Sequence, residues 1–496
     1  MPRTGVEPAR EYKSHYHLKV ACLPIPPPRH IIQQFYQTQH TNSISRGTDL
    51  GFIAKISLLM QNVLHNITYS SMKIKNVHAR EILDSNGVPT ISTEIEILSG
   101  EKGRADVPSG ASTGKTEVIE LRDEDSERYE GKGVLKAVEI VNTKIKDLLV
   151  GKEFTSQREF DQLLIDTDGT ELKKNLGGNS ILSCSMAFAR AVSNAFGLEL
   201  YEYLGMTYWE EEYDKKNFKL PTPQILMMEG AKHGNWSTDI QEYMLVPNME
   251  KFKTFSKALR ASAEIFHTIH DILDSKKYSV GLGLEGGYAP KELSSNEEAF
   301  DTILQGIQES GYKPQEDFSI ALDIAASEFF NKEKKLYQLR RENKVLNREE
   351  FIKLQREWYS KYPMASIEDP LYEDDWDGWV EFTKEFGNKY MVVGDDLLTT
   401  NTKRIKKGIN EKAINSVLIK LNQIGTVSET LDAIRMSIDN GMSAVISHRS
   451  GETNDDFIAD LVIATPAQYC KFGAPSRGER IVKYNRLLEI EEILKG

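Results

Sequence analysis

The chain has 496 residues, a mass of 56.2 kDa and a net charge of −12 at pH 7. This length allows two or three domains, or one large barrel beside a smaller unit. The acidic balance argues against nucleic acid as the main partner. Three scattered cysteines are too few for a disulfide framework or a Cys-x-x-Cys metal site, which favours a reducing compartment.

Residues 1–71 differ from the rest of the chain. They hold seven basic and three acidic residues, a balance of +4, so the other 425 residues carry −16. We expect a poorly ordered extension, or a stretch translated upstream of a start at Met72, in a cytoplasmic protein. An organellar transit peptide is the alternative. We expect no membrane span, since the best segment, 51–64, is short and interrupted by polar residues.

Residues 72–210 have the pattern of an α+β unit. Strand composition over 72–83 and 89–98 comes first. Apolar residues at helical spacing follow over 131–150 and 177–197. Strands followed by helices predict an α+β domain.

Residues 218–496 have a different sequence pattern, in which short apolar runs end in a polar residue. The end positions are Asp323, Glu368, Asp395, Lys420, His448 and Lys471. Their spacings of 45, 27, 25, 28 and 23 residues fit one strand–helix unit each, and the long first gap holds a charged insertion at 331–350. Helices are expected at 377–387, 402–413, 427–440 and 452–464. The pattern predicts a β/α barrel with its site at the carboxyl ends of the strands. An open doubly wound sheet is the alternative, without a glycine-rich dinucleotide motif to support it.

Three carboxylates, Asp323, Glu368 and Asp395, occupy equivalent places on consecutive predicted strands. On a barrel they would converge, and they would repel one another unless a cation or shared protons compensated. Oxygen ligands without His or Cys favour Mg²⁺. One such residue alone is commonly a turn or helix N-cap residue. The three in register predict a metal site.

Two lysines also follow predicted strands. Lys420, beside a metal and partly desolvated, could lose its proton and act as a general base. Its alternative is a structural ion pair with one of the carboxylates. Lys471 has the same alternative, or could bind an anionic substrate.

The run His448-Arg449-Ser450 follows a predicted buried strand and precedes what reads as a helix start. Arginine, a serine hydroxyl and helix N-terminal amides suit phosphate. A structural pair between Arg449 and a barrel carboxylate is the alternative. Together with the metal site, the run suggests a substrate that bears both carboxylate and phosphate.

Two acidic segments complete the candidate set. Glu242 follows Gln241, and Glu285 precedes two glycines that allow it to project into a site. A glutamate facing a basic lysine across a metal can expel a leaving group once a proton is removed. The small loop 107–114 is either an ordinary surface loop or a lid.

These segments together resemble enolase, from about Met72 to Leu494. The motifs that carry the resemblance, in order, are SGASTG, QE, EGG, LDIAASEFF, SIEDP, GDDL, KLNQIGT, SHRSGET and KFGAP. The resemblance implies an α+β capping domain over 72–210 and an enolase-type eight-stranded β/α barrel over 218–496. It also implies reversible dehydration of 2-phosphoglycerate to phosphoenolpyruvate with two Mg²⁺ ions, in a homodimer or an octamer of dimers.

The resemblance assigns roles by motif position. Asp323, Glu368 and Asp395 would hold the tighter Mg²⁺, and Ser112 would help to hold the second. Lys420 would remove the C2 proton, while Glu285, assisted by Glu242, would protonate the departing C3 hydroxyl. Arg449 and Ser450 would bind phosphate. The substrate-binding residues would be His233, Gln241, Glu242, Glu368, Lys420, His448, Arg449, Ser450 and Lys471.

The sequence departs from the family pattern in loops. The family segment NGGSHAGG reads EGAKHGNW at 229–236, DEGG reads LEGG with Leu284, and DSRGNPT reads DSNGVPT with Asn86. These changes motivate one alternative, an enolase paralogue that acts on a related phosphorylated or phosphonate carboxylic acid. A non-catalytic enolase-like binding protein is the other alternative. It predicts erosion of the acid, base or ligands, and none is visible.

Overall fold

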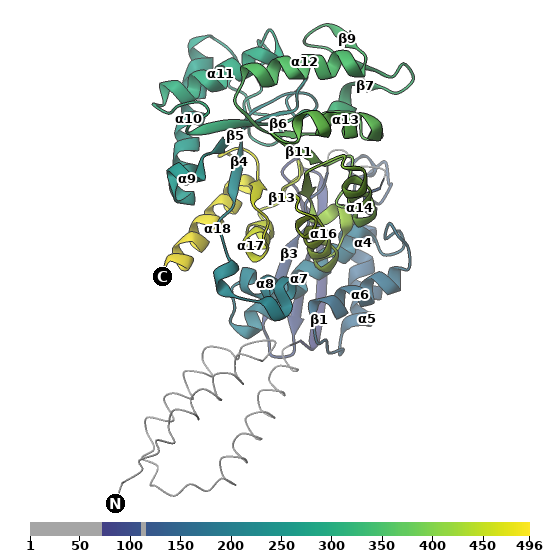
Figure 1. Cartoon of the computed structure of the whole chain (residues 1–496). Helices are drawn as coiled ribbons and strands as arrows, with labels where there is room; N and C mark the ends of the chain where they lie inside the picture. The colour runs from purple at the N-terminus through teal and green to yellow at the C-terminus, as the bar shows by residue number, and fades with distance from the viewer. Residues whose placement is uncertain (1–71, 111–115) are drawn as a thin grey trace, which may run out of the picture.

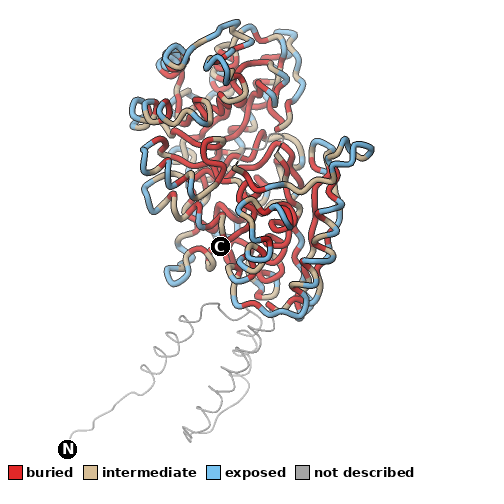
Figure 2. Tube along the Cα trace, turned by 90° about the vertical axis from the view of Figure 1, so that its right-hand side faces the viewer, coloured by how far each residue is buried: buried red, intermediate tan, exposed pale blue. Residues whose placement is uncertain are grey.

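The computed structural model of the chain describes residues 72–110 and 116–496. The predictions made for residues 1–71 and for Ser112 lie outside this part of the chain. Within it, a small unit of strands and helices lies at one end of the molecule and a barrel surrounded by helices at the other (Figure 1). Buried segments run through the middle of both units and exposed segments surround them (Figure 2).

The small unit begins with an antiparallel sheet of three strands. These are β1 (Ile74–Leu83), β2 (Pro89–Ile97) and β3 (Lys102–Asp106). The first two strands were predicted at 72–83 and 89–98. The helices that follow are α4 (Leu135–Ile140), α5 (Lys146–Leu149), α6 (Gln157–Asp168), α7 (Gly178–Phe196) and α8 (Leu200–Trp209). The expected order of strands and then helices is therefore present.

Two details of this unit differ from, or add to, the sequence pattern. The helix expected over 131–150 is interrupted by a π-helical turn, Val141–Ile145, where the Asn142 side chain bonds the backbone N–H and C=O of Ala79 on β1. Helix α7 packs closely on β3, because a Cβ at Gly103 would lie 2.2 Å from backbone atoms of Ala187 and Ala191. Only glycine allows this approach.

Eight strands close into a barrel. In spatial order they are β4 (Thr222–Glu229), β5 (Glu242–Pro247), β6 (Phe318–Asp323), β10 (Met364–Glu368), β11 (Met391–Gly394), β12 (Ser416–Ile419), β13 (Ser443–Ser447) and β14 (Tyr469–Lys471). Strand β5 is antiparallel to both neighbours and the other pairs are parallel. The parallel strands are mostly buried, as their continuous apolar runs indicate. The closed barrel excludes the open doubly wound sheet.

Helices surround the barrel. They are α9 (Met249–Phe252), α10 (Phe255–Ser275), α11 (Asn296–Glu309), α12 (Arg348–Lys361), α13 (Trp376–Phe386), α14 (Thr402–Glu411), α15 (Leu421–Ile424), α16 (Val427–Asp439), α17 (Phe457–Ala464) and α18 (Gly478–Lys495). Three of the four predicted barrel helices agree closely. The fourth, expected at 452–464, begins only at Phe457. The charged insertion at 331–350 contains a small sheet of β7 (Phe330–Asn331), β8 (Leu336–Leu339) and β9 (Lys344–Leu346).

No single helix within residues 72–110 and 116–496 is long and apolar enough to cross a membrane. One pair of helices, Gly178–Phe196 with Leu200–Glu212, is together long and apolar enough to cross a membrane by length and composition alone, and it is bent by 106°.

A buried carboxylate joins the small unit to the barrel. Asp161 on α6 is fully buried and accepts hydrogen bonds from the Ser428 backbone N–H and hydroxyl, at 2.9 and 2.6 Å, in the first turn of α16. Burial raises the pKa of Asp161 to about 6.

Replacing Asp161 with alanine leaves both Ser428 donors buried without their acceptor. We expect the Asp161→Ala variant to lose about 3 kcal/mol of unfolding free energy in urea titrations at pH 8. The control is Asp432→Ala, which removes an ion pair with Arg158 from two half-exposed side chains and should change stability by less than about 1 kcal/mol. Equal midpoints for Asp161→Ala and the wild type would contradict this role.

Candidate active site

The reversed direction of β5 determines which residues meet at the barrel mouth. Seven strands end at the mouth, whereas β5 starts there, so its first residue lies beside the last residues of its neighbours. Glu242 is paired in register with Glu229 on β4 and with Asp323 on β6, and Asp323 is paired with Glu368 on β10. Four carboxylates therefore lie in a row along one rim.

One pocket collects the predicted site residues. Those that line it are His233, Gln241, Glu242, Glu285, Asp323, Asp395, Lys420, His448, Arg449, Ser450 and Lys471. Glu368 does not line this pocket, but it contacts the pocket residue Lys471. Except for Ser112, which is not described, every predicted site residue is in or next to the pocket.

Lys471 holds three of the four rim carboxylates together. Its Nζ lies 3.2 Å from Glu242 Oε1, 3.3 Å from Asp323 Oδ2 and 2.9 Å from Glu368 Oε2, and all four side chains are buried. Burial disfavours the ammonium, but these carboxylates raise the pKa of Lys471 well above its usual value. Burial and the neighbouring acids raise the pKa of Glu368 and Glu242. Lys471 is therefore a fixed positive charge.

Lys420 forms the second lysine–carboxylate pair. It follows β12, and its Nζ lies 2.5 Å from Asp395 Oδ2. Burial favours the neutral amine, yet Asp395 raises the pKa of Lys420 above its usual value. The structural ion pair that the sequence left open is thus present, and Lys420 keeps its proton while it shares this carboxylate.

Residues that the sequence analysis did not single out support Asp395. Gln423 donates from Nε2 to Asp395 Oδ1 at 3.0 Å. Asp369 accepts hydrogen bonds from the backbone N–H of Asp395 and of Asp396. The signals in the sequence were the motif KLNQIGT, which contains Gln423, and the pair of acidic residues in each of the motifs SIEDP and GDDL.

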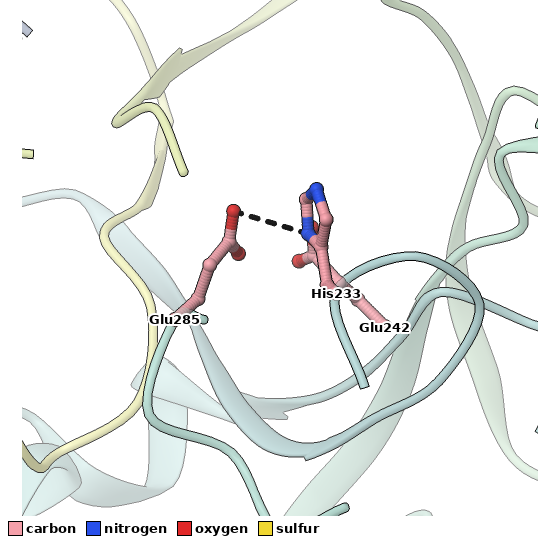
Figure 3. A group of neighbouring side chains, drawn as sticks. All are labelled: His233, Glu242 and Glu285. Carbon is pink, nitrogen blue, oxygen red and sulfur yellow. Dashed lines mark ion pairs between the residues drawn. The ribbon is translucent and has the colours of Figure 1, made fainter. Parts of the chain in front are cut away.

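His233, Glu242 and Glu285 point toward one another at the other side of the pocket (Figure 3). His233 Nδ1 lies 3.3 Å from Glu285 Oε1 and 4.0 Å from Glu242 Oε1. Burial lowers the pKa of His233. The imidazole therefore lies beside both carboxylates and closer to that of Glu285.

Arg480 on α18 determines which ring nitrogen of His448 carries the proton. It donates to His448 Nδ1 at 2.7 Å and to the backbone oxygens of Arg449 and Ser450. Because arginine stays charged, Nδ1 must accept, which places the imidazole proton on Nε2, 3.2 Å from Glu285 Oε2. Burial, helped by Arg480, lowers the pKa of His448 to about 3. Arg480 follows the KFGAP motif by five residues, but no sequence pattern pointed to it.

The partner of Arg449 comes from the small unit. Its Nη1 lies 3.2 Å from Glu117 Oε2 and donates to Asn422 Oδ1 at 2.6 Å. The alternative of a pair with a barrel carboxylate was therefore wrong about the partner, since Glu117 lies before the barrel in the chain. The expected helix start directly after Ser450 is also wrong. A loop follows, and α17 begins at Phe457.

Several buried atoms at this mouth point to a bound group. Among the described residues, the buried side-chain atoms without a hydrogen-bond partner include His233 Nδ1, Glu242 Oε2, Glu285 Oε2 and His448 Nε2. Buried polar atoms are normally satisfied, so such a concentration is typical of a ligand site. The donor set fits hard cations such as Mg²⁺, because the pocket is rich in carboxylate oxygens.

Two groups of side chains bring their ligand atoms within 4.8 Å of one another. They are His233, Glu242 and Glu285, and Asp369, Asp395 and Asp396. Of the predicted metal triad, only Asp395 belongs to either group; Asp323 and Glu368 meet instead at Lys471. The assignment of Asp323, Glu368 and Asp395 as one metal site stays a prediction.

Family models match both units of the chain. Residues 74–204 match the model described as "Enolase, N-terminal domain", and residues 217–496 match "Enolase, C-terminal TIM barrel domain". The chain belongs to the enolase family. This confirms the resemblance and the predicted fold of an α+β domain before an eight-stranded barrel. It also supports an enolase-type lyase function.

The low pKa of His448 has a consequence for acid stability. In the unfolded chain the His448 imidazole has an ordinary pKa near 6.5 and becomes protonated below that pH. In the folded protein it stays neutral down to about pH 3. The folded protein is therefore at its most stable, as far as His448 is concerned, above about pH 6.5. It loses stability as the pH falls toward 3, because only the unfolded chain binds the proton there. We expect the melting temperature of His448→Asn to fall less steeply than that of the wild type between pH 6.5 and 4.

The control for this comparison is His270→Asn, which changes an exposed histidine on α10. Its melting temperature should follow the wild-type pH dependence. Parallel pH profiles for His448→Asn and the wild type would show that His448 is not held neutral in the folded protein.

Proposed function

We propose that this protein catalyses the Mg²⁺-dependent, reversible dehydration of 2-phosphoglycerate to phosphoenolpyruvate. The observation that carries the proposal is the position of two strands. In the barrel order, β12 and β5 are separated by three strands on either side, so Lys420 and Glu242 face one another across the mouth. A base on one side and an acid on the other suit removal of a proton and a hydroxyl from adjacent carbons.

Lys420 acts as the base in this proposal. Its amine removes the proton from C2, and the electron pair left on that carbon forms the C2–C3 double bond as the C3 hydroxyl departs. For Lys420 to accept a proton, Asp395 must be neutralised by another charge. A cation held by Asp395 has this effect on the lysine pKa.

Glu285 is the acid in this proposal, and its carboxyl lies beside Glu242 and two histidines. His448 Nε2 lies 3.2 Å from Glu285 Oε2, and His233 Nδ1 lies within 4.0 Å of both Glu285 and Glu242. A proton passed from Glu285 to the departing C3 hydroxyl completes a molecule of water. In the reverse direction, the same carboxylate takes the proton back from water.

Charge on the substrate is met by fixed cations. Lys471 stabilises the negative charge that develops on the substrate carboxylate, because its ammonium stays protonated. Arg449 and Ser450 bind the phosphate. Asp323, Glu368 and Asp395 would hold Mg²⁺, which supplies further positive charge at the substrate carboxylate.

One observation favours a related phosphorylated or phosphonate carboxylic acid as a second candidate substrate. The 229–236 segment, where the sequence departs from the family, contacts the insertion and the short 3-10 helix Ala326–Phe329 that follows β6. The Arg340 guanidinium lies 3.8 Å from the centre of the Trp236 ring, and Lys232 pairs with Glu328. A segment held in this way would shape the pocket for one substrate.

The first test is direct. Purified protein with Mg²⁺ and 2-phosphoglycerate should form phosphoenolpyruvate, followed by its ultraviolet absorbance. Lys420→Ala should be slower by at least about 100-fold, since it removes the general base. Lys403→Ala, which changes an exposed lysine on α14, should turn over at the wild-type rate. Wild-type turnover no faster than that of Lys420→Ala would contradict the proposal.

The second test concerns the metal. Mg²⁺ should raise the melting temperature of the wild type, because it binds the folded protein preferentially. We expect Asp323→Asn to weaken Mg²⁺ binding at least about tenfold, a loss of about 1.4 kcal/mol, and so to reduce this shift. Asp377→Asn, an exposed acid on α13, should leave it unchanged. Equal Mg²⁺ affinity in Asp323→Asn and wild type would remove Asp323 from the metal site.

A further inference from the structure

Glu229, the last residue of β4, has no role in the proposed reaction but holds the turn that carries Glu285. Its Oε1 accepts the backbone N–H of Glu285 at 3.0 Å and that of Gly287 at 2.7 Å, and its Oε2 lies 3.2 Å from the same Glu285 N–H. The side chain is buried. One carboxylate thus binds the amides on both sides of Gly286.

The turn is shaped around this carboxylate. A Cβ at Gly283 would lie 2.2 Å from Glu229 Oε2, so only glycine leaves room for the glutamate there. At Gly287, a Cβ would lie 3.1 Å from the Glu229 Cγ. The fit between the turn and the carboxylate is therefore close on both sides.

The other contacts of the turn leave the amides of Glu285 and Gly287 to Glu229, while those of Gly283, Leu284 and Gly286 bond backbone oxygens. Ala474 donates its N–H to the Glu285 backbone oxygen at 3.1 Å, and the Ser476 hydroxyl donates to the Gly286 oxygen at 2.8 Å. Both of these bonds use carbonyl groups. The position of the Glu285 amide, and hence the direction in which its side chain leaves the backbone, depends on Glu229.

Burial and the neighbouring Glu285 make it unfavourable for the Glu229 carboxyl to carry a negative charge. Burial, followed by repulsion from Glu285, raises the pKa of Glu229 to about 8. The two backbone donors and the nearby charge of Arg480 act in the opposite direction. The backbone donors of the turn thus offset part of the cost of burying a second carboxyl beside the acid.

We propose that Glu229 is a positioning residue, which holds the 283–287 turn so that Glu285 can protonate the leaving hydroxyl. This inference rests on the proposed function for its catalytic consequence, but the clamp itself is a property of the fold. It predicts that loss of Glu229 impairs the step that needs the acid and spares the step that needs only the base.

The experiment compares Glu229→Gln with Asp168→Asn. Glutamine keeps the size of the side chain but replaces one acceptor oxygen with a donor that opposes the turn amides. Asp168 is a matched control, since it is also buried and accepts three backbone N–H groups, from Thr170, Asn175 and Leu176, outside the barrel.

Three quantities are measured. Dehydration of 2-phosphoglycerate is followed by absorbance, and exchange of its C2 hydrogen with deuterated water by nuclear magnetic resonance, because exchange requires the base but no departing hydroxyl. Hydrogen–deuterium exchange of the peptide that contains 283–287 is followed by mass spectrometry. For Glu229→Gln, we expect dehydration about 100-fold slower, C2 exchange within about threefold of wild type, and turn amides that exchange about tenfold faster.

The outcomes separate the two proposals. Dehydration by Glu229→Gln within twofold of wild type, or C2 exchange that falls as far as dehydration, overturns the positioning role. If the wild type neither dehydrates 2-phosphoglycerate nor exchanges its C2 hydrogen, the proposed function fails. The amide exchange then decides whether Glu229 clamps the turn. Turn amides equally protected in Glu229→Gln, Asp168→Asn and wild type overturn the clamp itself.

A second variant covers a failure of Glu229→Gln to fold, detected by its melting temperature. Glu229→Asp keeps the carboxyl group but withdraws it by one methylene from the Glu285 and Gly287 amides. The same split between slowed dehydration and preserved C2 exchange is expected. Wild-type dehydration by a folded Glu229→Asp protein overturns the proposal.

Discussion

The site is organised around one ammonium group that reaches across the barrel. Lys471 belongs to β14, and its Nζ contacts carboxylates on β5, β6 and β10. In the circular strand order, β14 and β10 are separated by three strands on either side. Without this charge, the buried acids of the rim would repel one another. Lys471 thus permits the density of carboxylates on which any cation or substrate binding at this mouth depends.

The small unit supplies part of the same site. Glu117 pairs with Arg449, and the backbones of Ser109 and Gly451 exchange hydrogen bonds at 2.7 and 3.0 Å. Asp161 joins α6 to the start of α16 on the same side of the barrel. The loop that contains Arg449 and Ser450 is therefore held from the small unit as well as from α18. The way in which the two units dock therefore also determines the geometry of this loop.

Much of this arrangement could be predicted from the sequence, for a physical reason. An apolar run that ends in a polar residue marks a buried parallel strand and its carboxyl end, so Asp323, Glu368 and Lys471 could be placed at one mouth. Arg480 and Glu117 could not, because their partners lie far away in the chain. The role of Glu229 could not be predicted either. Its partners are backbone amides of a distant turn, and every residue type except proline has such an amide. The direction of β5 was equally hidden, as one short apolar strand reads the same either way.

That direction has a consequence for how such a barrel can change. The connection between β4 and β5 leaves the mouth and returns to it, so both of its ends lie in the site. The connection from β5 to β6 begins and ends at the far end of the barrel. The remaining connections between barrel strands start at the mouth and travel to the far end. Insertions or substitutions between Glu229 and Glu242 can therefore remodel the rim without altering the length of any surrounding helix. The 229–236 segment, one of the places where this chain departs from its family, lies in this connection.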